Sequence, residues 1–185
     1  MSQVLTANEI GEIKLSSSWK SFLPAAIAIV GSFIMMFAKH QAGENFISDG
    51  ALMMIALACY LLAALFQLTN LYAPSEMAQK IGFWTATLGV FFNLSSWLVR
   101  WIAAYDLEAA QLIASGHTEL PWIFRYIPFA NLYDLSVAFA FGAGITTLLI
   151  AKRKDFQVIS AFSLPIAALI LILARFIGGE FINLP

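Results

Sequence analysis

The chain has 185 residues, of which 61% are hydrophobic and only 11% are charged, and its formal net charge is −1. So few charges cannot cover a water-soluble globule, and the apolar fraction exceeds what one core of this size can bury. The near-neutral charge and the lack of a long Lys/Arg-rich block argue against nucleic acid as a partner. We therefore predict an integral membrane protein that has lipid around it.

Five segments are long and apolar enough to form transmembrane helices, because a hydrocarbon core of about 30 Å requires about 20 apolar residues in helix. Lipid cannot bond to free backbone groups, so helices are the form that these runs must take. The first twenty residues are polar and of mixed charge, which does not fit a signal peptide. The predicted fold class is all-α, a single membrane domain over 1–185 with spans at about 22–38, 51–72, 81–99, 132–151 and 156–174.

The segment 100–131, between the third and fourth spans, is too long for a simple turn. Its part 106–114 has helical spacing, which predicts a short amphipathic helix lying in the plane of the membrane interface. Gly116 is placed to end that helix as a C-cap, and the aromatic residues around it suit an interfacial belt. The apolar side of the predicted helix is formed by Leu107, Ala110, Ile113 and Ala114.

Lys and Arg in short loops predict the orientation of the chain. The strongest cluster, Lys152 to Lys154, lies between the fourth and fifth spans and predicts a cytoplasmic turn. Alternation then gives a cytoplasmic N-terminus, a periplasmic 100–131 segment and a periplasmic C-terminus. The predicted location is the bacterial cytoplasmic (inner) membrane.

Several polar and small residues in or beside the spans have structural interpretations. Asn93 lies inside a span, so we expect it to bond to another helix. Asn131 is placed to cap the fourth helix, and the helix dipole favours Asp134 in the first turn. Gly142 and Gly144 predict a helix-packing face. No metal-spaced residue set, phosphate loop or catalytic motif occurs, so the sequence assigns no catalytic residue and leaves open whether the protein is an enzyme.

An ordered set of short motifs resembles the CcsA/ResC family of cytochrome c assembly proteins, which handle haem in membranes. The pieces are Arg100-Trp101, Ser115-Gly116-His117, Pro128 and Asn131-Leu132-Tyr133-Asp134, which resemble the family's R-W, S-G-H, P and N-L-Y-E. The flanking runs "LGVFFNLSSWLVRW" and "ISAFSLPIAALILILA" are also similar to the family's helices. The resemblance covers about Met54 to the C-terminus and corresponds to the family's N-terminal half.

This resemblance implies a haem-related setting, yet two of the family's haem features are missing. The family's Trp-rich periplasmic segment has no counterpart, and Asn93 lies where many bacterial members have a histidine ligand. A carboxamide does not ligate haem iron as imidazole does. We therefore expect no cofactor and no metal to be bound by this chain alone.

Two functions remain open. In the first, the protein is a non-catalytic scaffold among other integral membrane subunits of a respiratory or photosynthetic electron-transfer complex. In the second, it is one part of a split cytochrome c synthetase, in which a separate Trp-rich chain helps deliver haem to apocytochrome c. In that case Arg100 and Arg125 would bind haem propionates, and His117 would contact the haem or act as a base, while Asn131, Tyr133 and Asp134 complete the motif.

Overall fold

The computed structural model describes residues 7–117, 119–150 and 157–177, and every regular element among them is helical. The prediction of an all-α fold is therefore confirmed. The elements in chain order are α1 (Ala7–Ala42), η1 (Gly43–Asn45), α2 (Asp49–Tyr72), α3 (Glu76–Ala114), η2 (Ile123–Tyr126), α4 (Leu132–Ile150) and α5 (Gln157–Ile177), where η denotes a short 3-10 helix.

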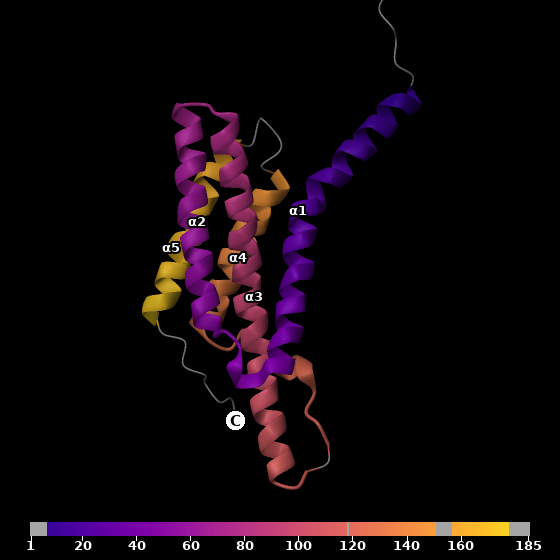
Figure 1. Cartoon of the computed structure of the whole chain (residues 1–185), viewed down its shortest axis with the longest axis vertical. Helices are drawn as coiled ribbons and strands as arrows, with labels where there is room; N and C mark the ends of the chain where they lie inside the picture. Colours follow the sequence, from indigo (N-terminus) through magenta and orange to yellow (C-terminus); the bar gives the residue numbers. More distant parts are fainter. Residues whose placement is uncertain (1–6, 118, 151–156, 178–185) are drawn as a thin grey trace, which may run out of the picture.

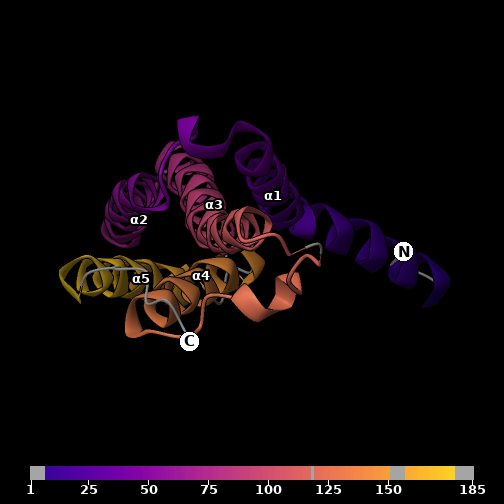
Figure 2. The ribbon, with the colours of Figure 1, turned by 90° about the horizontal axis from the view of Figure 1, so that it is seen from below.

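Helices α2 to α5 form a four-helix bundle, and α1 packs on the outside of it against α3 (Figure 1). Within the bundle, α2 contacts α3 and α5, and α4 contacts the same two helices. Seen from below, α2 and α3 lie over α5 and α4, with α1 on the far side of α3 from α2 (Figure 2). Successive helices run in opposite directions along the bundle.

Local capping explains where the helices begin and end. The hydroxyl oxygens of Ser48 and Ser75 accept hydrogen bonds from backbone N–H groups in the first turns of α2 and α3. At the other end of α3, Gly116 adopts φ +82°, and the N–H of His117 donates to the carbonyl of Leu112 at 3.0 Å. This is a Schellman-type C-cap. The prediction that Gly116 caps a helix is confirmed.

The predicted interfacial helix at 106–114 is wrong as a separate element. These residues are the last turns of α3, which runs unbroken for 39 residues. The reason is local, because no glycine or proline lies between Gly89 and Gly116, and Ala103 and Ala104 favour helix. At 1.5 Å per residue, a helix of this length spans about 58 Å, and its C-terminal end continues beyond the bundle (Figure 1).

Among the residues that the structure describes, four helical segments are long and apolar enough to cross a membrane, namely Phe22–Asn45, Asp49–Tyr72, Leu132–Ile150 and Val158–Phe176. They contain the first and second predicted spans and most of the fourth and fifth. The third predicted span, 81–99, lies within α3, which is not among these four. Lys152, Arg153 and Lys154, on which the predicted orientation depends, lie outside the described residues.

Small side chains fill much of the interior of the bundle beside larger buried ones such as Tyr60 and Leu52, and many large apolar side chains point outward. Alanines account for many of the buried positions, including Ala56, Ala63 and Ala140, which are fully buried. Phe37, Phe139 and Phe176 are each more than 60% exposed. This is the reverse of a water-soluble core, and it suits helices that approach one another closely while facing lipid on the outside.

Candidate functional site

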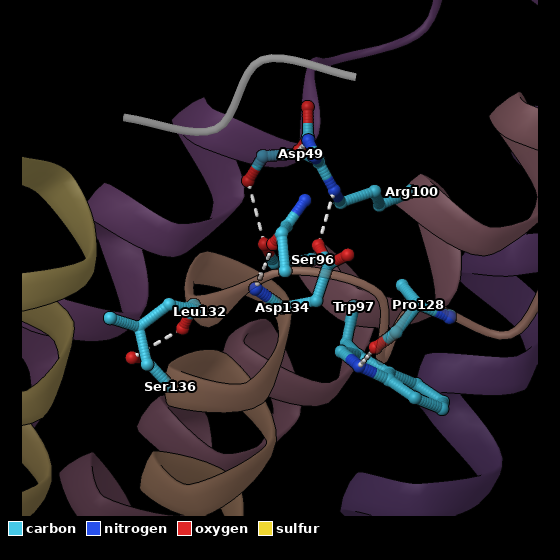
Figure 3. A network of polar contacts seen from close by, with 9 residues as sticks. Asp49, Ser96, Trp97, Arg100, Pro128, Leu132, Asp134 and Ser136 are labelled. Atoms are coloured by element: carbon cyan, nitrogen blue, oxygen red, sulfur yellow. Dashed lines mark hydrogen bonds and ion pairs between the residues drawn. The ribbon is translucent and has the colours of Figure 1, made fainter. Parts of the chain in front are cut away.

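An ion cluster joins three helices at the end of the bundle where α2 and α4 begin (Figure 3). Arg100 of α3 donates from Nε to Oδ1 of Asp134 at 2.6 Å. It also donates from Nη1 to Oδ2 of Asp49 at 3.1 Å. The side chains of Arg100 and Asp134 are each only 5% exposed. The cluster therefore ties α2, α3 and α4 together through charges that are largely hidden from water.

The two carboxylates owe their positions to helix starts. Asp49 is the first residue of α2, directly after its N-cap Ser48. Asp134 is in the first turn of α4, where its backbone N–H donates to Oδ1 of Asn131 at 2.8 Å. Negative charge is favoured at helix N-termini, because the free N–H groups and the helix dipole stabilise it. The prediction that Asn131 caps α4 is confirmed.

Neighbouring side chains hold the cluster from the sides. The guanidinium of Arg100 lies over the ring of Tyr133, 4.8 Å from the centroid, which is a cation–π distance. The hydroxyl of Ser96 donates to the backbone carbonyl of Asp49 at 2.8 Å. The indole of Trp97 donates to the carbonyl of Pro128 at 3.0 Å, which fixes the incoming chain before α4 (Figure 3).

The structure brings the motif residues together but leaves the other predicted haem contacts outside. Arg100, Tyr133 and Asp134 meet in the cluster, so the guanidinium is already engaged by two carboxylates. His117 is exposed just beyond the end of α3, where its Nδ1 lies 3.0 Å from the hydroxyl of Ser115. Arg125 is exposed in η2. Neither of these two exposed side chains is part of the ion cluster.

Asp49 is the member of the cluster that sequence reasoning missed. The available signal was a charge balance: Arg100 at the end of an apolar run needs a carboxylate at the same depth. Asp49, after Ser48 and before the apolar run of α2, is at such a depth. Further along α3, at the surface, Nδ1 of His40 in α1 lies 2.8 Å from Oδ1 of Asp106.

A second polar cluster lies inside the bundle. Asn93 of α3 is fully buried, 3.3 Å from the hydroxyl of Tyr60 in α2. In the amide orientation that satisfies both ends, its nitrogen donates to the carbonyl of Val137 at 3.3 Å. Its oxygen then accepts from the N–H of Phe141 at 2.8 Å. Asn93 thus bonds to two other helices, and the prediction that it finds a partner on another helix is confirmed.

Two glycines make room for the ring of Tyr60. A Cβ at Gly89 would approach the ring to 2.6 Å, and one at Gly144 would collide with the hydroxyl. A Cβ at Gly142 would meet nothing within 4 Å. The predicted packing role is therefore confirmed for Gly144, whereas Gly142 does not face a close neighbour.

Aromatic residues form a collar around this end of the molecule. Trp97 and Trp101 of α3 have ring centroids 6.0 Å apart, and Trp101 also contacts Phe124 of η2 at 5.8 Å. Tyr126 packs against Tyr105 at 6.0 Å, and its hydroxyl is buried without a hydrogen-bond partner. Burial raises the pKa of Tyr126 above its usual value, and the nearby carboxylate of Glu108 adds to the rise.

The chemistry available in these clusters is that of ion pairing and hydrogen bonding. In the part of the chain that the structure describes, no group of three or more His, Cys, Asp and Glu side chains is placed to hold a metal ion. The bonded polar groups named above link one helix to another. Compared with known proteins, the chain matches no family model, no curated protein and no solved structure.

Proposed function

We propose that the protein is a non-catalytic, multi-pass membrane subunit that acts as a helical scaffold within a larger electron-transfer complex. The observation that supports a scaffold most directly is the state of Arg100. The side chain best suited to bind a haem propionate is buried and paired with Asp49 and Asp134. Freeing it for a ligand would leave the buried carboxylate of Asp134 and the partly buried one of Asp49 without their counter-charge, which is costly.

The membrane placement in this proposal has five spans. Four helices qualify by length and composition alone, and α3 is the fifth because α1, α2 and α4 all pack against it. Its polar residues Asn93, Ser95 and Ser96 are buried, so they lower its hydropathy without facing lipid. By the Lys/Arg rule, the end with the 73–75 connection faces the cytoplasm and the 115–131 end faces the periplasm of a bacterial inner membrane.

The electron-transfer setting rests on the resemblance to cytochrome c assembly proteins. Its two most distinctive pieces, Arg100-Trp101 and Asn131 to Asp134, are about 30 residues apart in the chain but meet in one ion pair. The pairing gives these two pieces a structural reason to occur together in this chain. It also supports the view that the shared element is a helical framework, since the paired groups hold helices and not a ligand.

The second candidate is a split haem-delivery subunit. The feature that favours it is the exposure of His117 and Arg125 at the same end of the molecule. A Trp-rich partner chain covering that end would bring both near a haem, with iron ligation available to His117 and propionate pairing to Arg125. In this reading too, Arg100 is a structural residue.

A spectrum of the purified protein separates the two candidates. The chain is extracted from its native membrane in mild detergent, resolved into the assembled and the isolated form, and each form is analysed as the pyridine haemochrome. The scaffold proposal expects redox cofactors in the assembled form and none on the isolated polypeptide. Haem that stays on the isolated polypeptide and is lost in His117→Ala, but not in the control Lys80→Met at the other end of the bundle, would overturn it.

Cysteine labelling tests the membrane placement. In a Cys59→Ala background, Ala73→Cys and Glu119→Cys place one thiol at each end of the bundle, both at exposed positions. A membrane-impermeant maleimide added to intact spheroplasts should label the thiol at 119, and the thiol at 73 only after permeabilisation. The opposite pattern would invert the orientation, and equal labelling of both would contradict spanning.

A further inference from the structure

The connection between α3 and α4 is fixed to α3 through its backbone. The indole of Trp101 donates to the carbonyl of Ile123 at 2.9 Å, and the indole of Trp97 donates to the carbonyl of Pro128 at 3.0 Å. Residues four apart lie on the same side of a helix, so the two bonds hold the connection along one side of α3. The inner side of the connection is therefore used within the chain.

The outer side of the connection is apolar and exposed. Trp122 is 72% exposed, and Phe124 and Phe129 are each more than half exposed. Leu132, the first residue of α4, is also exposed. We call these four residues the collar surface. Phe139, seven residues after Leu132 and therefore on the same side of α4, is exposed as well, so the collar surface continues into the outer side of the bundle.

The level of the collar surface follows from its contacts with α3. The ring centroid of Phe129 lies 5.3 Å from that of Trp97, and the centroid of Phe124 lies 5.8 Å from that of Trp101. At 1.5 Å per residue, Trp97 and Trp101 are both within about 5 Å of Arg100 along α3. The rings of the collar surface therefore lie close to the level of Arg100, where α2 and α4 begin.

That level is the boundary of the hydrocarbon core in the membrane placement proposed above. The part of α3 from 81 to 100 spans about 30 Å, which is the thickness of the core. The headgroup layer beyond it is about 5–8 Å deep, and aromatic rings are enriched in this layer. The position of the collar surface and its continuity with the outer side of α4 both indicate that lipid covers it.

Arg125 provides a polar contact at the same level. It is exposed between Phe124 and Tyr126 in η2, which packs against α3. It is also the only Lys or Arg in the segment 101–131. A guanidinium can donate two parallel hydrogen bonds to a phosphate group, and phospholipids present phosphate in the headgroup layer. Arg125 is thus placed to bind a lipid phosphate while the rings beside it lie among the headgroups.

We infer that the collar surface rests in the headgroup layer of the periplasmic leaflet, where Arg125 binds a lipid phosphate. The inference rests on the membrane placement proposed above. It gives the connection between α3 and α4 a function as an anchor that sets the depth of this end of the bundle in the bilayer.

Spin labels measure the depth of the collar surface. The protein with Cys59→Ala is placed in phosphatidylcholine nanodiscs, with a nitroxide at Trp122→Cys or Phe129→Cys. Reference labels are at Phe139→Cys in α4 and Gln111→Cys near the end of α3, both exposed positions. For each label, the collision rate with a water-soluble nickel chelate is divided by the rate with oxygen, which concentrates in lipid. The ratio should be lowest at 139, highest at 111 and intermediate at 122 and 129.

The reference labels separate failure of the inference from failure of the membrane placement. If 139 gives a low ratio but 122 and 129 match 111, the collar surface stands in water and is open to a protein instead, and the inference is wrong. If 122 and 129 match 139, the surface lies in the hydrocarbon core and the inference is also wrong. A ratio at 139 as high as that at 111 overturns the placement itself.

Charge exchange at Arg125 tests the phosphate contact. The label at 122 is measured in nanodiscs that also contain the anionic lipid phosphatidylglycerol. Arg125→Glu should raise the ratio by up to about fivefold, because attraction to the headgroups becomes repulsion, and by less as salt is added. Arg125→Lys should keep the ratio, since an ammonium also binds phosphate. The control Gln111→Glu adds a negative charge beyond the headgroups and should leave the ratio unchanged. Equal ratios in Arg125→Glu and Arg125→Lys overturn the role of Arg125.

Discussion

The bundle end and the 115–131 segment after α3 use the same kinds of side chain in opposite ways. At the bundle end, Arg100 is buried and bonded to carboxylates of two other helices. On the 115–131 segment, Arg125 and His117 are exposed. Charge that is buried and fixed in this way stabilises a fold, whereas exposed charge remains available to a partner. The motif residues lie in the bundle and stabilise it. The exposed charges of the 115–131 segment are therefore the better candidates for contact with a partner.

The strongest test of this comparison is to replace each of the two arginines, in turn, by methionine. Arg100→Met leaves Asp49 and Asp134 without their cation, so we expect a loss of about 3–5 kcal/mol in stability. Arg125→Met, at an exposed site, should change stability by less than about 0.5 kcal/mol. Thermal unfolding in detergent, followed by circular dichroism, measures both.

A compensating variant shows whether the loss comes from the uncompensated charge. Arg100→Met combined with Asp49→Asn and Asp134→Asn removes the buried charges together, and replacing a buried ion group as a whole is often close to neutral. We expect the triple variant to recover most of the lost stability. If it is no better than Arg100→Met alone, the ion cluster is not what holds this end of the bundle together.

The next largest effect is expected at the packing of Tyr60. Gly144→Ala places a methyl group against the Tyr60 hydroxyl, and overpacking of this kind costs about 1–3 kcal/mol. Gly142→Ala, two residues away on the same helix, meets open space and should be neutral or gain up to about 1 kcal/mol from helix propensity. The two unfolding midpoints, compared under one set of conditions, should therefore move in opposite directions or differ clearly.

A smaller effect is expected at the start of α4, where the bundle end meets the incoming segment. Asn131→Ala removes the side chain that accepts from the Asp134 N–H and should cost about 1 kcal/mol, as the loss of an N-cap does. Asn131→Asp keeps an acceptor and should retain most of the stability. Equal losses in the two variants, measured by the same thermal unfolding, would show that the cap is not the relevant contact.

Much of the helical framework could be predicted from the sequence because its signals are local. The caps at Gly116 and Asn131 depend only on a few neighbouring residues. The need of Asn93 for a partner follows from its place in an apolar run. The faces of Gly142 and Gly144 could not be told apart in this way, since residues two apart lie about 200° from each other around a helix. Only the packing of α4 against Tyr60 decides which of them faces inward.

The ion cluster of Arg100 and the full length of α3 could not be predicted from local sequence signals. Arg100 and Asp134 were both singled out, but as separate residues with separate explanations. Asp49 is 51 residues from Arg100 in the chain, and they pair because α2 and α3 pack at one register. The helix end was misplaced because the apolar pattern changes near Arg100 while the backbone signals for helix continue to Gly116. The end of the apolar run near Arg100 therefore does not mark the end of the helix.

The smallest effect is expected at Tyr126, which lies in the segment after α3. The hydroxyl of Tyr126 is buried without a partner, so Tyr126→Phe should be neutral or stabilising by up to about 1 kcal/mol at pH 8. Because burial raises the folded pKa of this phenol above the unfolded value of about 10, the neutral form stabilises the fold relative to the ionised form. That contribution is complete below about pH 10 and is lost as the pH rises through the folded pKa. The unfolding midpoint of Tyr126→Phe should therefore exceed that of the unmodified protein by an increasing margin above pH 10. A Phe variant that is less stable at pH 8 would mean that the hydroxyl has a bonding partner.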